Sequence, residues 1–256
     1  MKSSMFQSSS VLTTICGVLS AGMLLSSLSP VQAKPFVNGE LLANNVTFVP
    51  PDGDQPRDTQ GGASRGGKCP KDDQSLNPYL TPVIPANAQR LTSQPQAKIF
   101  VYIPQTAAKK AFVSLKDDKN QHHYQTFLPL EKKGGIVQIS LPDDAPDLSV
   151  GTEYKWSFAI VCGDRLLPDD PTVTGTIRRI NLDQKLTNQV KNLGENPSLE
   201  QADLLGKSGL WYDMLTVLVS LKTEQPNNLQ LDNIWSNILK LSNLEKIATQ
   251  PIIANK

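Results

Sequence analysis

Two hydrophobic periods divide this sequence near residue 180, and the change between them limits the fold more than any other feature. From Ala97 to Ile180, apolar and polar residues alternate in short runs separated by turn residues, which is typical of β-strands. The clearest run is 154–162, where five bulky side chains fall on one face: Tyr154, Trp156, Phe158, Ile160 and Cys162. After Ile180 the apolar residues recur with the period of a helix. The sequence therefore predicts a β + α fold with the strands first.

We expect seven short antiparallel strands in the β region, counting one edge strand near Leu80–Ile84. The other six are Lys98–Ile103, Ala111–Leu115, His123–Leu128, Ile136–Leu141, Tyr154–Cys162 and Thr172–Ile180. This pattern is typical of an immunoglobulin-like or fibronectin-like β-sandwich, which we assign to residues 96–180. Leu148, Gly151 and Tyr154 have the spacing of a tyrosine corner, in which the phenol bonds back to the backbone. Antibody domains place a cysteine two residues after that tyrosine, whereas this chain has Trp156.

The C-terminal region, residues 181–256, is predicted to be helical. The apolar stripe of a first amphipathic helix runs from Leu182 to Leu193. Asn196 and Pro197 have the residue types of the N-cap and the first helical position of the next helix. Four later residues have the types and positions that characterise a tetratricopeptide hairpin, namely Ala202, Leu205, Leu218 and Pro226. Met214 and Leu221 depart from that pattern, which prefers alanine at both positions. Such repeats need about three copies to stand alone, so we expect these helices to dock on the sandwich or on a partner. All three tryptophans fall on apolar stripes and are expected in the core: Trp156, Trp211 and Trp235.

The N-terminus has the pattern of a secretory signal peptide, residues 1–33. Lys2 precedes an apolar stretch, and a small residue, Ala33, stands at the expected cleavage position. Lipidation of Cys16 is disfavoured because Ile15, not a small residue, precedes it. The apolar runs are shorter than the roughly 20 residues of a membrane span. We therefore predict export to the periplasm or the medium, with no stable membrane span after signal removal.

Residues 34–95 are rich in proline and glycine, which interrupt helices and strands. We expect an extended leader there, partly disordered and flexible at least as far as Gln60. Two cysteines remain after signal removal, Cys69 and Cys162, in a chain predicted to enter an oxidising compartment. We predict that they form a disulfide across 93 residues; the alternative is two unrelated buried thiols.

Charge argues against nucleic acid as a partner. The 25 Lys and Arg residues nearly balance the 24 Asp and Glu residues, and no basic cluster is longer than a pair. A phosphate backbone is bound through clustered Lys and Arg. Anionic membrane surfaces are disfavoured for the same reason.

Three candidate chemistries are better explained as structure. Gly62–Gly66 fits the letters G-x-S-x-G, but a nucleophile elbow needs a hydrophobic strand before the serine and a helix after it, and neither flank supplies them. His122 and His123 are strand neighbours that point to opposite faces, with no further histidine to complete a metal site. The acidic pairs Asp117-Asp118, Asp143-Asp144 and Asp169-Asp170 indicate solvated turns. We predict no catalytic residue, no metal site and no cofactor.

A glycine-rich loop is the remaining candidate for a functional site. Arg57, Ser64, Arg65 and Lys68 lie in or near it, and the predicted disulfide would hold it against the sandwich. If a small anion or the backbone of a partner binds anywhere, we expect it here.

Four blocks of the sequence resemble one family. GGASRGGKCP, FVYIP, LPDDAPDLSVGTEYKWSFAIVC and GLWYDMLTVLVSLKTEQPNN are similar, in this order, to blocks of the cyanobacterial family called domain of unknown function 928. The resemblance runs from about residue 60 to the C-terminus and implies that Ser64, Arg65, Cys69 and Pro70 belong to a shared block. It implies no activity.

Together these features favour an exported, non-enzymatic module that binds another envelope or secreted protein. One alternative is an extracytoplasmic hydrolase or carbohydrate-active enzyme that uses the loop Gly61–Pro70. A second alternative is a structural component of the envelope.

Overall fold

The two hydrophobic periods correspond to nine strands and four α-helices in the computed structural model, which describes residues 46–51, 67–75, 77–86, 88–96, 98–142 and 145–253. The strands are β1 (Thr81–Pro82), β2 (Leu91–Thr92), β3 (Lys98–Ile103), β4 (Lys110–Lys116), β5 (His122–Pro129), β6 (Gly135–Ser140), β7 (Glu153–Val161), β8 (Thr172–Arg179) and β9 (Ile252–Ile253). The helices are α1 (Gln184–Asn192), α2 (Leu199–Lys207), α3 (Trp211–Glu224), α4 (Leu229–Leu241) and the 3-10 turn η2 (Glu245–Ile247). The predicted β + α class is confirmed.

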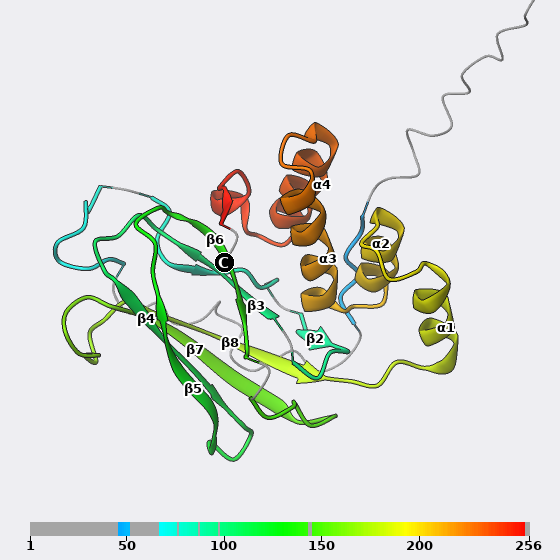
Figure 1. Cartoon of the computed structure of the whole chain (residues 1–256), viewed down its shortest axis with the longest axis horizontal. Coiled ribbons are helices and arrows are strands. Elements are labelled where there is room, and N and C mark those ends of the chain that lie inside the picture. Colours follow the sequence, from blue (N-terminus) through cyan, green and yellow to red (C-terminus); the bar gives the residue numbers. More distant parts are fainter. Residues whose placement is uncertain are drawn as a thin grey trace, which may run out of the picture. The chain divides into compact units, whose positions relative to one another are not determined.

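The strands form two sheets, with the orders β1-β3-β6-β9 and β2-β8-β7-β4-β5 (Figure 1). All six longer strands pair antiparallel with one another, as predicted. The prediction that every pair is antiparallel is wrong, because β2 pairs parallel with β8 and β9 pairs parallel with β6. Both additional strands have only two residues, too few for alternation to indicate a strand. β9 also lies after the helices, in a region predicted to be helical throughout.

The inner faces of the two sheets share a hydrophobic core. Ile99 and Ile139 of the four-stranded sheet line the same small internal gap as Val113 and Trp156 of the five-stranded sheet. Trp156 is fully buried, and its ring lies where a side chain on Gly175 would stand: a Cβ built there would be 2.3 Å from the indole. The alternation predicted for 154–162 therefore places its large side chains in the core.

A tyrosine corner joins β7 to the segment before it. The amide of Ser149 donates to the Tyr154 hydroxyl at 3.1 Å, which is the bond predicted from the Leu148-Gly151-Tyr154 spacing. Gly151 allows the turn because its φ is +82°, a value that favours glycine.

Tyr154→Phe should lower the free energy of unfolding by about 1 kcal/mol, because the Ser149 amide loses its acceptor while the ring stays buried. Tyr124→Phe is the matched control, since Tyr124 lies half-buried in β5. Urea denaturation of both variants measures the difference. Equal losses in the two variants would contradict a role for the corner bond.

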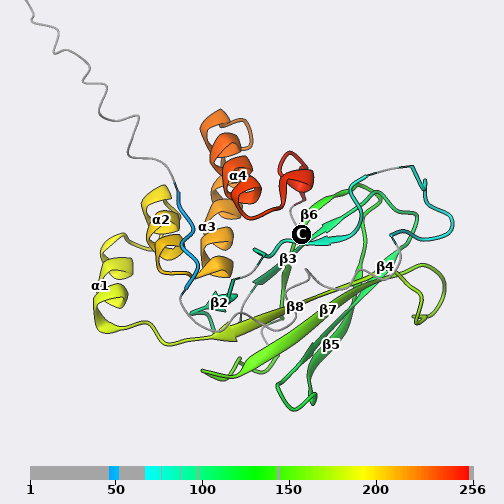
Figure 2. The ribbon, with the colours of Figure 1, turned by 180° about the vertical axis from the view of Figure 1, so that it is seen from behind.

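The helices pack on the sheets through α3, which is buried on almost every side. The Trp211 indole donates to the carbonyl of Val83 at 3.0 Å, and the Trp156 indole donates to the Tyr212 hydroxyl at 3.0 Å. Near the start of α3, Asp213 accepts hydrogen bonds from the segment of β2. Figure 2 shows α3 beside β2 and β3 from behind, and the helices therefore share the core of the sheets.

The start of α2 differs from the prediction. Its N-cap is Ser198, whose hydroxyl accepts from the Gln201 amide at 3.1 Å, and not Asn196. A serine followed by a glutamine three positions later is the pattern of a capping box, a stronger signal than an Asn-Pro pair two residues earlier.

The prediction of a leader flexible as far as Gln60 is wrong for residues 46–51, which pack against α2. The Val49 amide donates to the Gly206 carbonyl at 3.0 Å, and the Phe48 ring meets the Trp211 ring edge-on at 4.8 Å. Gly206 makes the approach possible, because a Cβ there would lie 2.3 Å from the Thr47 carbonyl oxygen. Burial of Val46 and partial burial of Phe48 against the core supply the driving force.

Candidate functional site

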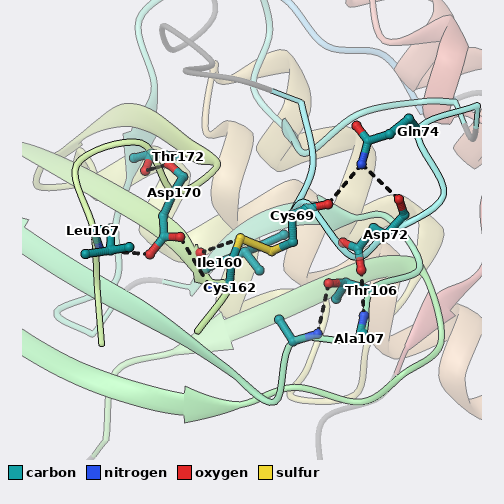
Figure 3. Close-up of a disulfide and its surroundings, with 11 residues drawn as sticks. Cys69, Asp72, Gln74, Thr106, Ala107, Ile160, Cys162, Leu167, Asp170 and Thr172 are labelled. Atoms are coloured by element: carbon teal, nitrogen blue, oxygen red, sulfur yellow. Dashed lines mark hydrogen bonds between the residues drawn. A yellow bond between two sulfur atoms is a disulfide. The ribbon is translucent and has the colours of Figure 1, made fainter. Parts of the chain in front are cut away.

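The disulfide predicted from the sequence is present and joins two distant loops. Cys69 and Cys162 lie 5.3 Å apart between Cα atoms, and Cys162 directly follows β7 (Figure 3). Cys69 is buried, with 3% of its surface exposed. The disulfide attaches the loop 67–75 to the end of the five-stranded sheet.

Hydrogen bonds hold the same loop independently of the disulfide. Asp72 accepts from the Ala107 amide at 2.8 Å, and the Gln74 side-chain amide donates to the carbonyls of Cys69 and Asp72 (Figure 3). Ser75 donates its hydroxyl and its amide to Asp73, and these bonds lower the pKa of that exposed carboxyl. The loop is therefore fixed at several points.

The residues proposed for an anion or partner site are only partly placed. Arg57, Ser64 and Arg65 lie outside the described residues, as does Ala33, the predicted signal cleavage position. Lys68 is described, and its ammonium donates to the Asp73 carbonyl at 2.8 Å and lies 5.3 Å from the centre of the Tyr79 ring. The structure therefore gives Lys68 partners within its own loop.

One acidic pair corrects the prediction of solvated turns. Asp170 is buried, with 4% of its surface exposed. Its carboxylate accepts from the Cys162 amide at 3.3 Å and from the Leu167 amide at 2.9 Å (Figure 3). The turn therefore folds around Asp170 beside the disulfide. The sequence alone could not indicate this, because an aspartate in a turn can either be solvated or be buried as an acceptor for backbone amides. Asp117 is half-buried and caps its own turn, while Asp143 and Asp144 lie outside the described residues.

The two histidines do not meet on one face. His123 hydrogen-bonds the Pro146 carbonyl at 2.9 Å through Nε2, and its ring lies 4.7 Å from the Tyr154 ring. His122 is exposed at the start of β5. Among the described residues, no three His, Cys, Asp or Glu side chains come together as a metal site would need.

A groove of about 640 Å³ was not predicted from the sequence. The end of α3 contributes Lys222, α4 contributes Asn233, Trp235 and Ser236, and residues 248–252 form another wall. Its volume is in the range of ligand-binding pockets, roughly 300–1,000 Å³. Pro251 could have indicated the non-helical segment that forms this wall, because a proline interrupts a helix.

Charge in the groove is largely neutralised. Lys222 forms an ion pair with Asp232, and the Lys222 side chain is only 15% exposed. The other polar side chains that line the groove are uncharged amides and hydroxyls, namely Thr223, Asn233, Ser236, Thr249 and Gln250. The groove therefore suits a ligand with hydrogen-bonding groups and little net charge.

The profile of the family described as Domain of Unknown Function (DUF928) matches residues 60–252. The chain belongs to this family. The match includes the disulfide loop from Gly67, both sheets, all four helices and the groove, so the DUF928 region contains both candidate sites.

No curated protein matches the chain significantly. Within the described residues, no DUF928 helix has the length and apolar content that crossing a bilayer requires.

Proposed function

We propose that this DUF928 protein is exported and acts without catalysis, by binding another secreted or envelope protein in the groove between α4 and residues 248–252. The groove carries this proposal, because it combines an open volume of about 640 Å³ with uncharged hydrogen-bonding side chains. Protein surfaces that bind partners use such mixed lining, with apolar contacts in the centre and hydrogen bonds for orientation. The predicted signal peptide and the Cys69–Cys162 disulfide support export, since disulfides persist in oxidising compartments.

We further propose that the two sheets are an immunoglobulin-like or fibronectin-like sandwich and that α2, α3 and α4 are a tetratricopeptide-like unit. The Tyr154 corner bond supports the first. The close packing of α2 on α3 and of α3 on α4 supports the second, since paired helices of this kind present grooves to peptides.

Affinity capture tests the binding function. The mature protein, beginning at Lys34, is immobilised and exposed to periplasmic extract and culture medium. We expect one defined protein to be enriched by the wild type and by Asn188→Arg, and to be lost at least tenfold with Asn233→Arg. Asn188 and Asn233 are both exposed helical asparagines, but only Asn233 lines the groove.

Two results would contradict the proposal. Equal capture by the wild type and Asn233→Arg would exclude the groove as the site. Absence of any protein enriched over a blank matrix would argue against partner binding and favour a structural component, which light scattering would show as self-association.

A further inference from the structure

We infer that the groove binds an extended peptide segment, which adds to the edge of the four-stranded sheet beside β9; this inference rests on the proposed partner-binding function. The sheet order β1-β3-β6-β9 places β9 at an edge. Gln250, Pro251 and Ile252 line the groove, so this edge and the groove adjoin. Figure 1 shows the C-terminal segment between the sheet and α4.

The register of β9 leaves one residue available for pairing. The Ile136 amide donates to the Pro251 carbonyl at 2.8 Å, and Ile136 is paired with Ile252. In a parallel ladder of this register, the amide and carbonyl of Ile252 itself point away from β6. In the described part of the chain no further strand pairs with β9. An unpaired strand edge is the backbone feature that an added peptide strand recognises.

The indole of Trp235 supplies a second, independent observation. Trp156 donates its indole N–H to Tyr212 and Trp211 donates its own to Val83, both at 3.0 Å. Trp235 is equally buried, at 2% exposure, but its Nε1 has no acceptor among the described residues. A buried polar group without a partner costs free energy. A peptide carbonyl in the groove can accept this hydrogen bond after the small side-chain adjustments that are common on binding.

The burial of Trp235 also favours a peptide over a carbohydrate as the ligand. Sugars and other ring-shaped ligands usually stack on the exposed face of an aromatic side chain, and Trp235 offers none because only 2% of its surface is exposed. The paired charges of Lys222 and Asp232 leave the groove without a strong net charge. The geometry therefore favours an extended, largely uncharged peptide.

The test uses a randomised library of heptapeptides displayed on phage, with the mature, oxidised protein as bait. The selected peptide is then synthesised with capped ends and titrated into protein with ¹⁵N-labelled tryptophan. We expect the indole N–H signal of Trp235 to shift, while those of Trp156 and Trp211 stay in place because their acceptors are internal. The two partnered indoles are thus controls within the same spectrum.

Two substitutions at one position test the strand pairing. Ile252→Pro removes the amide that faces away from β6, and we expect the peptide affinity to fall at least tenfold. Ile252→Val keeps the amide and should retain the affinity within about twofold. Urea denaturation of both variants checks that β9 remains docked.

The outcomes distinguish this inference from the proposed function. Peptide binding that neither shifts the Trp235 signal nor depends on the Ile252 amide would overturn the groove inference and leave partner binding intact. Failure to select any peptide would overturn the inference, while affinity capture still decides partner binding. A Trp235 shift on addition of chitohexaose, without peptide binding, would overturn the peptide inference in favour of a carbohydrate ligand, and affinity capture would again decide partner binding.

Discussion

Replacement of Cys69 and Cys162 by serine should lower the free energy of unfolding by about 4 kcal/mol. The disulfide closes a loop of 93 residues, and a crosslink of that length removes much of the conformational freedom of the unfolded chain. The expected loss is a large part of the 5–15 kcal/mol that is typical of a domain. The measurement is urea denaturation of the oxidised wild type and of the double variant.

The loop 67–75 should stay in place in this variant. Asp72 still accepts from the Ala107 amide. Gln74 still donates to the carbonyl of residue 69, because that carbonyl belongs to the backbone and is unchanged when Cys69 becomes serine. The effect should therefore come mainly from the unfolded state, and the dependence of unfolding on urea should become steeper as that state expands.

Reduced wild-type protein is the control for the substitutions. It should lose about the same stability as the double variant, since both lack the crosslink. A loss below about 1 kcal/mol in both would show that the disulfide does not stabilise the fold. A loss in the variant alone would instead indicate that serine disturbs the buried position of Cys69.

The six longer strands could be predicted from the sequence because each packs one face against the core, although in β5 that face is only half-buried. Alternation over five or more residues located Lys98–Ile103 with its observed bounds and the others to within one residue at each end. The corner bond of Tyr154 was also predictable, because it depends on a local spacing. Sequence patterns within one segment were therefore sufficient for the features that form within one segment.

The features that sequence reasoning missed depend on contacts between distant segments. β9 exists because residues 252 and 253 pair with Ile136 and Val137, more than a hundred residues earlier. The groove needs that pairing as well as α4, and the unpartnered indole of Trp235 differs from the other two tryptophans only in its tertiary surroundings. No pattern within a single segment carries this information.

Asp213→Ala should lower the free energy of unfolding by about 3 kcal/mol, because it leaves buried donors without acceptors. The Asp213 carboxylate accepts from the Thr92 hydroxyl at 2.5 Å, and from the Ser93 amide and hydroxyl at 2.8 and 2.6 Å. These bonds attach β2 to the start of α3, where a negative side chain is also favoured by the helix dipole.

Asp73→Ala is the matched control for this prediction. Asp73 also accepts from the amide and hydroxyl of a serine, Ser75, but it is exposed and water can replace the lost bonds. Its substitution should change stability by no more than about 0.5 kcal/mol. Similar losses for the two variants would show that burial of Asp213 does not determine the cost.

The pH dependence of stability tests the charge of Asp213 separately. Burial raises the pKa of this carboxyl above its ordinary value of 3.8, although the bonds from Ser93 and Thr92 oppose the shift. Between 3.8 and the raised pKa the folded state therefore binds a proton that the unfolded state does not, and stability must increase as the pH falls through that window. Asp213→Asn removes the titration, so the stability of the wild type relative to this variant should increase as the pH falls through the raised pKa and become constant below 3.8. A relative stability that decreases on acidification would mean that the three hydrogen bonds outweigh burial and that the carboxylate is the favoured form.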